Sequence, residues 1–209
     1  MPTSAPFEQH ADRYEEWFET HGAAYESEVT ALRRLLPETG RGVEIGVGSA
    51  RFAAPLGIQL GVDPSRRMLG YARERGVEAV QGVAEALPFP DGAFDTALIV
   101  TTICFVDDIP RALAEAERVL RPDGGLVIGY IDRDSPVGQV YQENKETNPF
   151  YREATFVSTG ELLEALEAAG FTDFEFVQTV YQWPGDLGAP DPVDPGYGEG
   201  SFVGIRATR

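Results

Sequence analysis

The sequence predicts an α/β fold in which a mostly parallel sheet carries helices on both faces. Short apolar runs alternate with segments of helical periodicity between residues 42 and 131. The first run, residues 42–45, breaks into a turn that contains two glycines, and Asp63 ends the second run, residues 58–62. In open α/β sheets, ligands bind outside the carboxyl ends of the strands. We therefore expect a binding site at this edge of the sheet.

The elements of this core alternate between strand and helix, except that no helix is expected between the third and fourth strands. The apolar runs that we expect to form parallel strands are residues 42–45, 58–62, 77–80, 94–100 and 125–131. The helical patterns between them are residues 50–56, 65–75 and 111–120. Pro64 and Gly76 delimit the second helix, and Asp107 and Asp108 are expected to cap the third.

Length and charge narrow the class of protein. A chain of 209 residues can form one domain with a substantial core, and no apolar run is long enough to span a membrane. The formal net charge is −17, and Lys145 is the only lysine. Such acidity disfavours nucleic acid as a partner and favours a salt-rich cytoplasm, although a GC-rich genome would also explain the missing lysines. We expect a cytoplasmic protein without membrane or nucleic-acid partners, as a monomer or homodimer.

The turn Gly46-Val47-Gly48 has the properties of a nucleotide site. Glycine permits positive φ and lets a ligand approach the backbone, and the next helix offers free N–H groups at its positive end. A dinucleotide fingerprint requires a small residue three positions after its second glycine, where this chain has Arg51. An acid at the end of the second strand, such as Asp63, can accept both hydroxyls of a ribose. A nucleoside without a pyrophosphate fits this pattern better than NAD.

Four motifs occur in order between residues 40 and 131. They are Glu44-x-Gly46-x-Gly48, then Gly61-Val62-Asp63-Pro64-Ser65 with Met68 following, then the run GVAEALPFPDGAFD at residues 82–95, and LRPDGG at residues 120–125. Together they resemble the class I S-adenosylmethionine-dependent methyltransferases, in particular the UbiE-like or type 11 group. The resemblance implies a Rossmann-like class I methyltransferase fold, with a seven-stranded sheet whose last strand is antiparallel, and S-adenosyl-L-methionine as cofactor.

The segments that flank the core complete the expected domain. Residues 7–21 carry aromatic groups at helical spacing and should form a helix that Gly22 ends, before a second helix that runs to Leu36. Residues 159–169 should form a capped helix, and residues 171–181 and 201–207 a strand pair. We expect one methyltransferase domain with four parts: an N-terminal helical cap (1–39), a cofactor-binding core (40–131), a lid insertion (132–157), and a C-terminal helix and strand pair (158–209).

The resemblance also implies roles for individual residues. Backbone groups of the glycine turn should hold the methionine and ribose side of the cofactor, and Asp63 the ribose hydroxyls. Val83 stands where the family usually has an aspartate that binds adenine. The adenine contact then falls to Met68, to backbone near Val83 and Ala84, or to Glu85, unless Glu85 is simply a solvated loop carboxylate. The candidate cofactor-binding residues are Tyr14, Glu44, Gly46, Val47, Gly48, Asp63, Pro64, Met68, Val83, Ala84, Glu85 and Thr101.

The sequence offers fewer candidates for catalytic residues than for cofactor-binding residues. If an acceptor must be deprotonated, His10 or Tyr14 is the first candidate for the base, although the aromatic residues of this segment would also serve to dock helices on the sheet. Cys104 has no histidine near it in sequence and is expected to pack as a small hydrophobic residue. The pair Asp107 and Asp108 lacks the His or Cys cluster of a metal site, so we expect no metal.

Three functions remain open at this point. The favoured one is methyl transfer to a small molecule. The second is methylation of RNA or protein, which the acidity disfavours, as does Thr101-Thr102-Ile103-Cys104 in place of an N/D-P-P-Y/F signature. The third is a non-catalytic nucleotide-binding or oxidoreductase domain of the same fold, which Arg51 disfavours.

Overall fold

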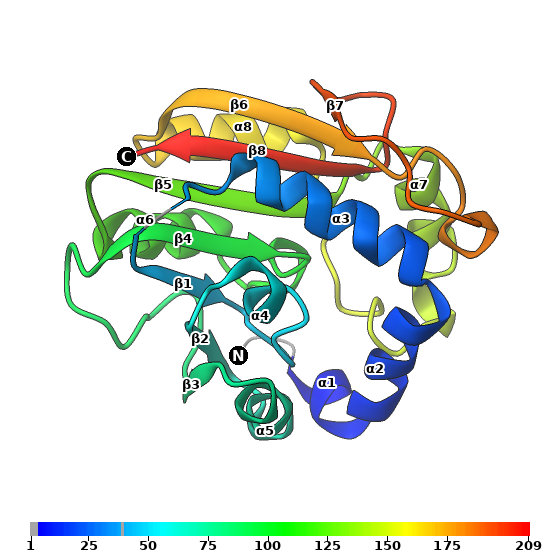
Figure 1. Cartoon of the computed structure of the whole chain (residues 1–209), viewed down its shortest axis with the longest axis horizontal. Helices are drawn as coiled ribbons and strands as arrows, with labels where there is room; N and C mark the ends of the chain where they lie inside the picture. The colour runs from blue at the N-terminus through cyan, green and yellow to red at the C-terminus, as the bar shows by residue number, and fades with distance from the viewer. Residues whose placement is uncertain (1–3, 39) are drawn as a thin grey trace.

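A computed structural model describes residues 4–38 and 40–209, so the ends of the expected helical cap, residues 1–3 and 39, lie outside the described residues. Within them the strands form a single sheet in the order β3-β2-β1-β4-β5-β8-β6-β7 (Figure 1). The strands are β1 (Gly42–Ile45), β2 (Leu60–Asp63), β3 (Glu78–Gln81), β4 (Phe94–Val100), β5 (Leu120–Ile131), β6 (Thr172–Thr179), β7 (Asp194–Pro195) and β8 (Phe202–Thr208).

The sheet is parallel from β3 to β5 and antiparallel beyond it. Val43 of β1 pairs with Leu60 of β2 on one side and with Ala97 of β4 on the other, both in parallel register. The strand β8 runs antiparallel to both β5 and β6. This confirms the predicted mostly parallel sheet with an antiparallel strand at the C-terminal end. The expected number of seven strands is exceeded because β7, only two residues long, adds an edge to β6.

Helices cover both faces of the sheet. In Figure 1 the helices α3 and α4 lie in front of the strands and α6 and α8 behind them. The helices are α1 (Ala5–Gln9), α2 (Ala11–Thr20), α3 (Gly22–Leu35), α4 (Ala53–Leu56), α5 (Arg66–Glu74), α6 (Ile109–Val119), α7 (Pro136–Glu143) and α8 (Thr159–Ala168), with 3₁₀ turns η1 (Ile103–Phe105), η2 (Lys145–Thr147) and η3 (Pro184–Asp186).

Side chains that alternate between the two faces of the buried strands form two separate cores. On β4, Ala97 and Ile99 belong to the core beneath α6 and α8, whereas Leu98 and Val100 belong to the core beneath α3, α4 and α5. Successive side chains of a strand point to opposite faces, so a strand covered on both sides is apolar throughout. This explains why residues 94–100 appear in the sequence as a continuous apolar run.

Three elements differ from the sequence prediction. The helix expected over residues 7–21 is broken at His10, whose φ of −121° and ψ of 31° are not helical. Its second part, α2, ends at Thr20, and Gly22 is the first residue of α3 where the sequence predicted a helix end. The helix expected from residue 50 begins only at Ala53. The expected strand 125–131 begins at residue 120, because Leu120 already pairs with Phe94 and the LRPDGG run forms a bulge within β5.

The packing of α3 on the sheet depends on Gly129 of β5. A Cβ atom at this position would lie 2.6 Å from the ring of Phe202 and 2.8 Å from a methyl of Leu32 on α3. Neither contact is tolerated in a close-packed core without movement of the neighbours. The helix α3 therefore approaches β5 closely only because residue 129 lacks a side chain.

We predict that Gly129→Ala lowers the free energy of unfolding by about 1–3 kcal/mol, because the added methyl overpacks the contact between α3 and β5. Urea denaturation measures the change. The control is Gly160→Ala in α8, where a Cβ would meet nothing within 4 Å and should be neutral or stabilising. Equal stabilities of the Gly129 variant and the wild type would contradict the packing argument.

Candidate active site

The turn after β1 is held between the two neighbouring strands. The N–H groups of Gly46 and Val47 donate to the carbonyl of Val62, at 2.8 and 3.0 Å. Gly46 and Gly48 have φ of +75° and +50°, which favour glycine. A Cβ on Gly46 would lie 2.3 Å from the side chain of Thr102, so this glycine permits contact with the segment after β4.

Gly48 faces an open space instead. The nearest atoms to a Cβ built there are the Met68 methyl at 3.6 Å and the Tyr14 hydroxyl at 3.8 Å. Gly48 also donates its N–H to Oδ2 of Asp63 at 2.9 Å. The second glycine of the motif therefore lies where a ligand could contact backbone, a carboxylate and a tyrosine together.

Asp63 is fixed at the end of β2 by backbone donors. Its Oδ1 accepts the N–H of Ser65 at 2.8 Å, and its Oδ2 accepts that of Gly48. Burial raises the pKa of Asp63 to about 6, although these two hydrogen bonds oppose the shift. Each carboxylate oxygen still has a lone pair available, because an ionised carboxylate offers about four acceptor positions. The carboxyl can thus hold two further donors.

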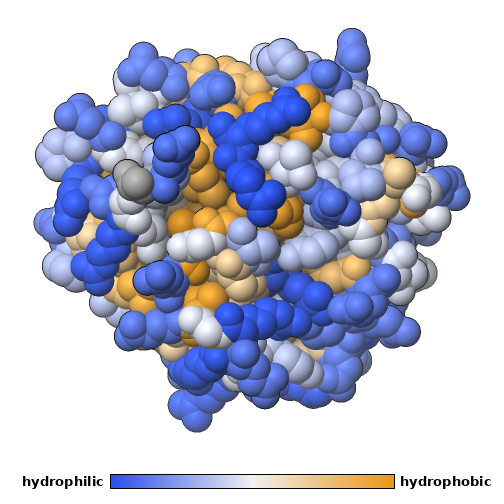
Figure 2. All heavy atoms as spheres, in the orientation of Figure 1, coloured by the Kyte–Doolittle hydropathy of each residue, from blue (hydrophilic) through white to orange (hydrophobic). Residues whose placement is uncertain are grey.

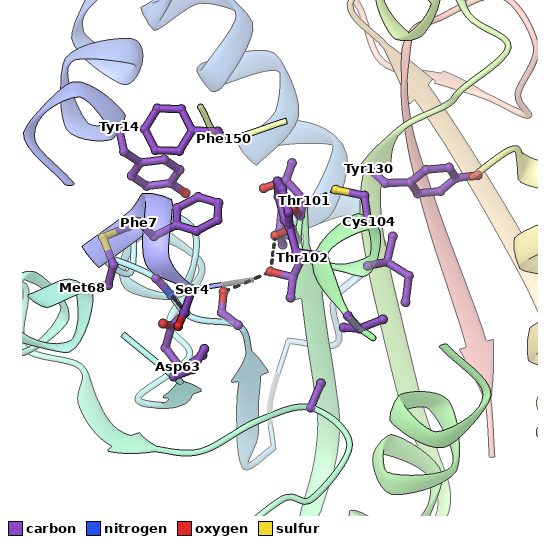
Figure 3. A pocket seen from close by; sticks show the side chains of 18 of the residues that line it. Ser4, Phe7, Tyr14, Asp63, Met68, Thr101, Thr102, Cys104, Tyr130 and Phe150 are labelled. Carbon is purple, nitrogen blue, oxygen red and sulfur yellow. Dashed lines mark hydrogen bonds between the residues drawn. The ribbon is translucent and has the colours of Figure 1, made fainter. Parts of the chain in front are cut away.

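A cavity of about 250 Å³ opens beside these residues. Figure 3 shows Phe7, Tyr14 and Phe150 on its helical side, facing Thr101, Thr102 and Cys104 after β4. The structure brings ten of the sequence-predicted residues to its wall: Tyr14, Gly46, Gly48, Asp63, Pro64, Met68, Val83, Ala84, Glu85 and Thr101. Thr101 has a φ of +48°, an uncommon conformation for a residue with a side chain, and this conformation often occurs at functional sites.

Two predicted residues lie behind the wall. Val47 is buried and occupies the space that a Cβ of Gly61 would need, 2.4 Å from that position, so it links the turn to β2. Glu44 is buried at the end of β1, and its Oε2 has no hydrogen-bond partner among the described residues. Burial raises the pKa of Glu44, and the nearby charge of Asp63 adds to the effect.

The two candidate bases differ in position. His10 is exposed and is not part of the cavity wall; its ring meets that of Phe150 at 6.3 Å. Tyr14 lies on the wall, where burial and the charge of Glu44 raise the pKa of its hydroxyl. A tyrosine with a raised pKa stays protonated and donates a hydrogen bond. The structure thus separates His10 from the other predicted residues and keeps Tyr14 with them.

The helices α1 and α2 attach to the core through charged and polar groups. The carboxylates come from the cap and the donors from the core: Glu8 with Ser65 and the Arg67 N–H, Asp12 with Arg67 and Tyr71, Glu15 with Arg51 and Arg75, and Glu19 with Arg51. Arg51, which the sequence showed to be too large for a dinucleotide fingerprint, therefore holds α2 against the glycine turn.

Hydrogen bonds from residues distant in the sequence hold the loop after β3 in place. Glu85 is not solvated, as one sequence reading allowed: it is buried, and its Oε1 accepts the N–H of Asp107 at 2.7 Å. Arg118 of α6 donates to the carbonyl groups of Leu87 and Phe89 at 3.1 and 2.8 Å. Side-chain hydrogen bonds to backbone thus fix the wall formed by Val83–Glu85.

Cys104 and the acceptor side of the cavity complete the site. Burial raises the pKa of the Cys104 thiol to about 12, so it remains a neutral, apolar group.

Sequence reasoning missed Glu28 of α3, which also lines the cavity. The available signal was its position four residues before Leu32, on the apolar face of an otherwise ordinary helix. Tyr197, in the loop between β6 and β8, packs on Phe176 and is not part of the cavity wall.

The described residues offer no alternative centre of metal chemistry. In residues 4–38 and 40–209, no group of three or more His, Cys, Asp or Glu side chains is arranged to hold a metal ion. In the same part of the chain, no helix is both long and apolar enough to cross a membrane.

Comparison with known proteins agrees with this geometry. Residues 43–128 match the methyltransferase domain family. An uncharacterised protein of Methanocaldococcus jannaschii is 41% identical over 205 residues, which cover 97% of this chain and 98% of that protein. The ubiquinone/menaquinone biosynthesis C-methyltransferase UbiE of Methylobacterium nodulans is 37% identical over 118 residues, 50% of this chain and 47% of the relative.

A solved structure from Thermotoga maritima resembles the whole chain. It is described as a SAM-dependent methyltransferase and "possible histamine N-methyltransferase", with 52% identity, 99% coverage of both chains and a TM-score of 0.97. The family, the fold and this relative agree on the cofactor, which is S-adenosylmethionine. The glycine turn, the acid that ends β2 and the cavity between them belong to an enzyme: the chain is a member of the class I S-adenosylmethionine-dependent methyltransferases.

Proposed function

We propose that the enzyme transfers the methyl group to a small-molecule acceptor held in the aromatic part of the cavity. The observation that supports this most is the enclosure of the site by four elements: α1, α2, the segment after β4 and the segment that contains Phe150. Phe7 of α1 meets Tyr14 of α2 at 5.7 Å, Phe105 after β4 at 5.0 Å and Phe150 at 5.3 Å. An enclosed, mostly apolar site with few polar groups is typical of small-molecule pockets.

Roles for the predicted residues follow from their positions. The backbone at Gly46 and Gly48 and the carboxylate of Asp63 would hold the methionine and ribose side of the cofactor, with Met68 and the Val83–Glu85 loop around adenine. These residues fit the group: Gly48 leaves open space beside Asp63, whose oxygens retain acceptor capacity. Glu44, with a buried Oε2 that lacks a partner, would add negative charge behind the turn.

Methyl transfer requires the protein mainly to align the acceptor with the methyl group. When bound, S-adenosylmethionine supplies a methyl group already activated for in-line displacement. The chain positions the acceptor against it and excludes water, and effective alignment alone accelerates such reactions strongly. Tyr14, held neutral by burial, would donate a hydrogen bond near the glycine turn; we assign it a binding role in preference to that of a base. His10 would act as a base only after a movement that brings it to the cavity.

Three further observations favour a small acceptor over RNA or protein. The net charge of −17 opposes approach of a phosphate backbone. The relative from Thermotoga carries the description of a possible methyltransferase of histamine, a small amine. A macromolecular acceptor would have to enter between α1, α2 and residues 148–156, whose side chains already meet one another.

The direct test is transfer of labelled methyl groups. Purified enzyme is incubated with S-adenosylmethionine and, separately, with pools of small amines, thiols, phenols and carboxylic acids, total RNA, and unfolded protein. We expect S-adenosylhomocysteine to form only with small-molecule pools. Turnover with RNA or protein alone would overturn the proposal.

We predict that Asp63→Ala weakens the binding of S-adenosylhomocysteine at least tenfold, because the ribose hydroxyls lose their acceptor. Isothermal calorimetry measures the affinity. Asp63→Asn retains one acceptor oxygen and should lose less, while Asp186→Ala, an exposed carboxylate on η3, should bind as the wild type does. Unchanged affinity in the Asp63→Ala variant would refute the ribose assignment.

A pH dependence is expected from the same carboxyl group. Its pKa of about 6 is raised above the ordinary value, so it gains a proton as the pH falls through 6 and then loses acceptor capacity for hydroxyl donors. The affinity for S-adenosylhomocysteine should therefore be about tenfold weaker at pH 5 than at pH 7. The Asp63→Asn variant should lack this dependence, and a flat wild-type profile between these values would contradict the prediction.

A further inference from the structure

Glu28 is a buried carboxyl group that no part of the proposed cofactor site uses. Its side chain belongs to the inner face of α3, one turn before Leu32, and only 4% of the residue is exposed. It lines the same cavity as Tyr14 and Thr101. Within residues 4–38 and 40–209, its carboxyl group forms no hydrogen bond or ion pair, and burial is the only cause of its pKa shift. Such a group is rare, because a buried carboxyl normally has a partner that compensates for lost hydration.

Four tyrosines lie within electrostatic reach of Glu28, and the charged residues that line the same cavity are Arg13, Asp63 and Glu85. The charge of Glu28 acts on Tyr14 of α2, on Tyr25 of its own helix, and on Tyr141 and Tyr151 of the 132–157 segment. The rings of Tyr141 and Tyr151 lie 4.8 Å apart, and Phe156 packs 5.5 Å from Tyr151. Burial raises the pKa of each of these tyrosines, so all of them remain neutral near pH 7.

An acid that shares a cavity with aromatic rings favours a particular ligand. Ring faces attract cations and offer little to anions, and a carboxyl group that gives up its proton attracts a cation as well. A neutral or anionic acceptor would leave Glu28 protonated and would form no ion pair with it. The wall therefore fits an organic amine, which brings both a positive charge and hydrogen-bond donors to the unpaired carboxyl.

We propose that Glu28 binds the methyl acceptor as an organic amine and removes a proton from its ammonium group before methyl transfer. This inference rests on the proposed small-molecule function and names the class of acceptor. Neither candidate base expected from the sequence is required for this step.

The proton balance of the step is complete. An ammonium nitrogen has no lone pair, so it must first give its proton to the carboxylate of Glu28, forming the carboxylic acid and the neutral amine. The nitrogen lone pair then forms the bond to the methyl carbon while the bond from carbon to sulfur breaks and its electrons remain on sulfur. The product is the methylated ammonium ion with S-adenosylhomocysteine, and Glu28 keeps its proton as the product leaves, because the single proton that the reaction yields is the one released when the ammonium compound binds.

The pKa of Glu28 suits this exchange. Burial raises it to about 8, so the free protein holds the proton at pH 7. A bound amine and Glu28 then share one proton between them, whereas before binding each carried its own. Binding of an ammonium compound at pH 7 should consequently release close to one proton, and this release depends on Glu28 and not on turnover.

The experiment uses the enzyme saturated with S-adenosylhomocysteine and three matched probes: 2-phenylethylamine, 2-phenylethanol and phenylacetate. Calorimetry at pH 7 in two buffers of different ionisation enthalpy gives affinity and proton release together. We expect the amine to bind at least tenfold more tightly than either analogue, with release of close to one proton. The set is extended with alkyl amines, aryl amines and amines that carry an imidazole ring. Each of them is compared with the alcohol and the carboxylic acid of the same carbon skeleton.

Two variants separate the role of Glu28 from general effects. In Glu28→Gln, which keeps the shape but cannot ionise, the preference for the amine and the proton release should both disappear. In Glu26→Gln, which alters an exposed carboxylate of the same helix, both should persist. Retained binding of S-adenosylhomocysteine in Glu28→Gln shows that the variant is folded, and thermal denaturation confirms it independently.

The outcomes distinguish this inference from the proposed function. Tighter binding of alcohols or acids than of amines across the whole set, or an unchanged amine affinity and proton release in Glu28→Gln, would overturn the amine assignment and leave a small acceptor in place. Failure of every small probe to bind, together with methyl transfer to RNA or protein alone, would overturn both.

Discussion

The site depends on two close backbone approaches at the carboxyl edge of the sheet. Gly46 lies against the side chain of Thr102, and Gly61 of β2 lies against Val47. A Cβ at either position would be within about 2.4 Å of the neighbouring side chain, closer than any real contact. Because both positions lack a side chain, the turn after β1 can lie between β2 and the segment after β4. Asp63 and Thr101 consequently reach the same cavity from different strands.

Three buried carboxyl groups then define the electrostatics around that turn. Asp63, Glu44 and Glu28 all have a pKa raised by burial, but their surroundings differ. Asp63 accepts two backbone N–H groups and is fixed in place, whereas Glu28 has no donor among the described residues and shares its cavity with Tyr14, Tyr141 and Tyr151. A carboxyl already fixed by backbone suits a ligand of fixed shape such as a ribose. One without a partner suits a ligand that brings its own charge.

The sequence predicted those parts of the structure in which local pattern and tertiary environment agree. The apolar run 94–100 became a strand covered on both faces, and Ser158 caps α8 through reciprocal hydrogen bonds with Glu161. The break at His10 was not predictable, because the aromatic spacing on both sides of it is helical. The bulge at residues 121–124 was missed because a turn motif does not reveal pairing between Leu120 and Phe94.

The site residues divide in the same way. Residues within the ordered motifs, such as Gly48 and Asp63, could be placed because strand ends meet at one edge of a parallel sheet. Glu28 was missed, since a single acid on a helix usually faces solvent, and its place on the apolar face of α3 was only a weak signal beside that expectation. Glu85 illustrates the converse: its sequence context is that of an exposed loop, while its carboxylate accepts backbone N–H groups across the structure.

The distribution of carboxylates between α1, α2 and the core gives the molecule two opposite responses to acid. Hydrogen bonds from Ser65 to Glu8 and from Tyr71 to Asp12 lower the pKa of these cap residues, so their contribution to docking is present above pH 4 to 5 and fades below it. Burial has raised the pKa of Glu28 and Asp63, so protonation relieves their cost as the pH falls. These two effects occupy different pH ranges: as the pH falls from about 8 to about 5 the interior is stabilised, and only below pH 4 to 5 does the attachment of α1 and α2 weaken. Below about pH 4 the first unfolding event should therefore be local, with the cap detaching from a sheet that remains intact.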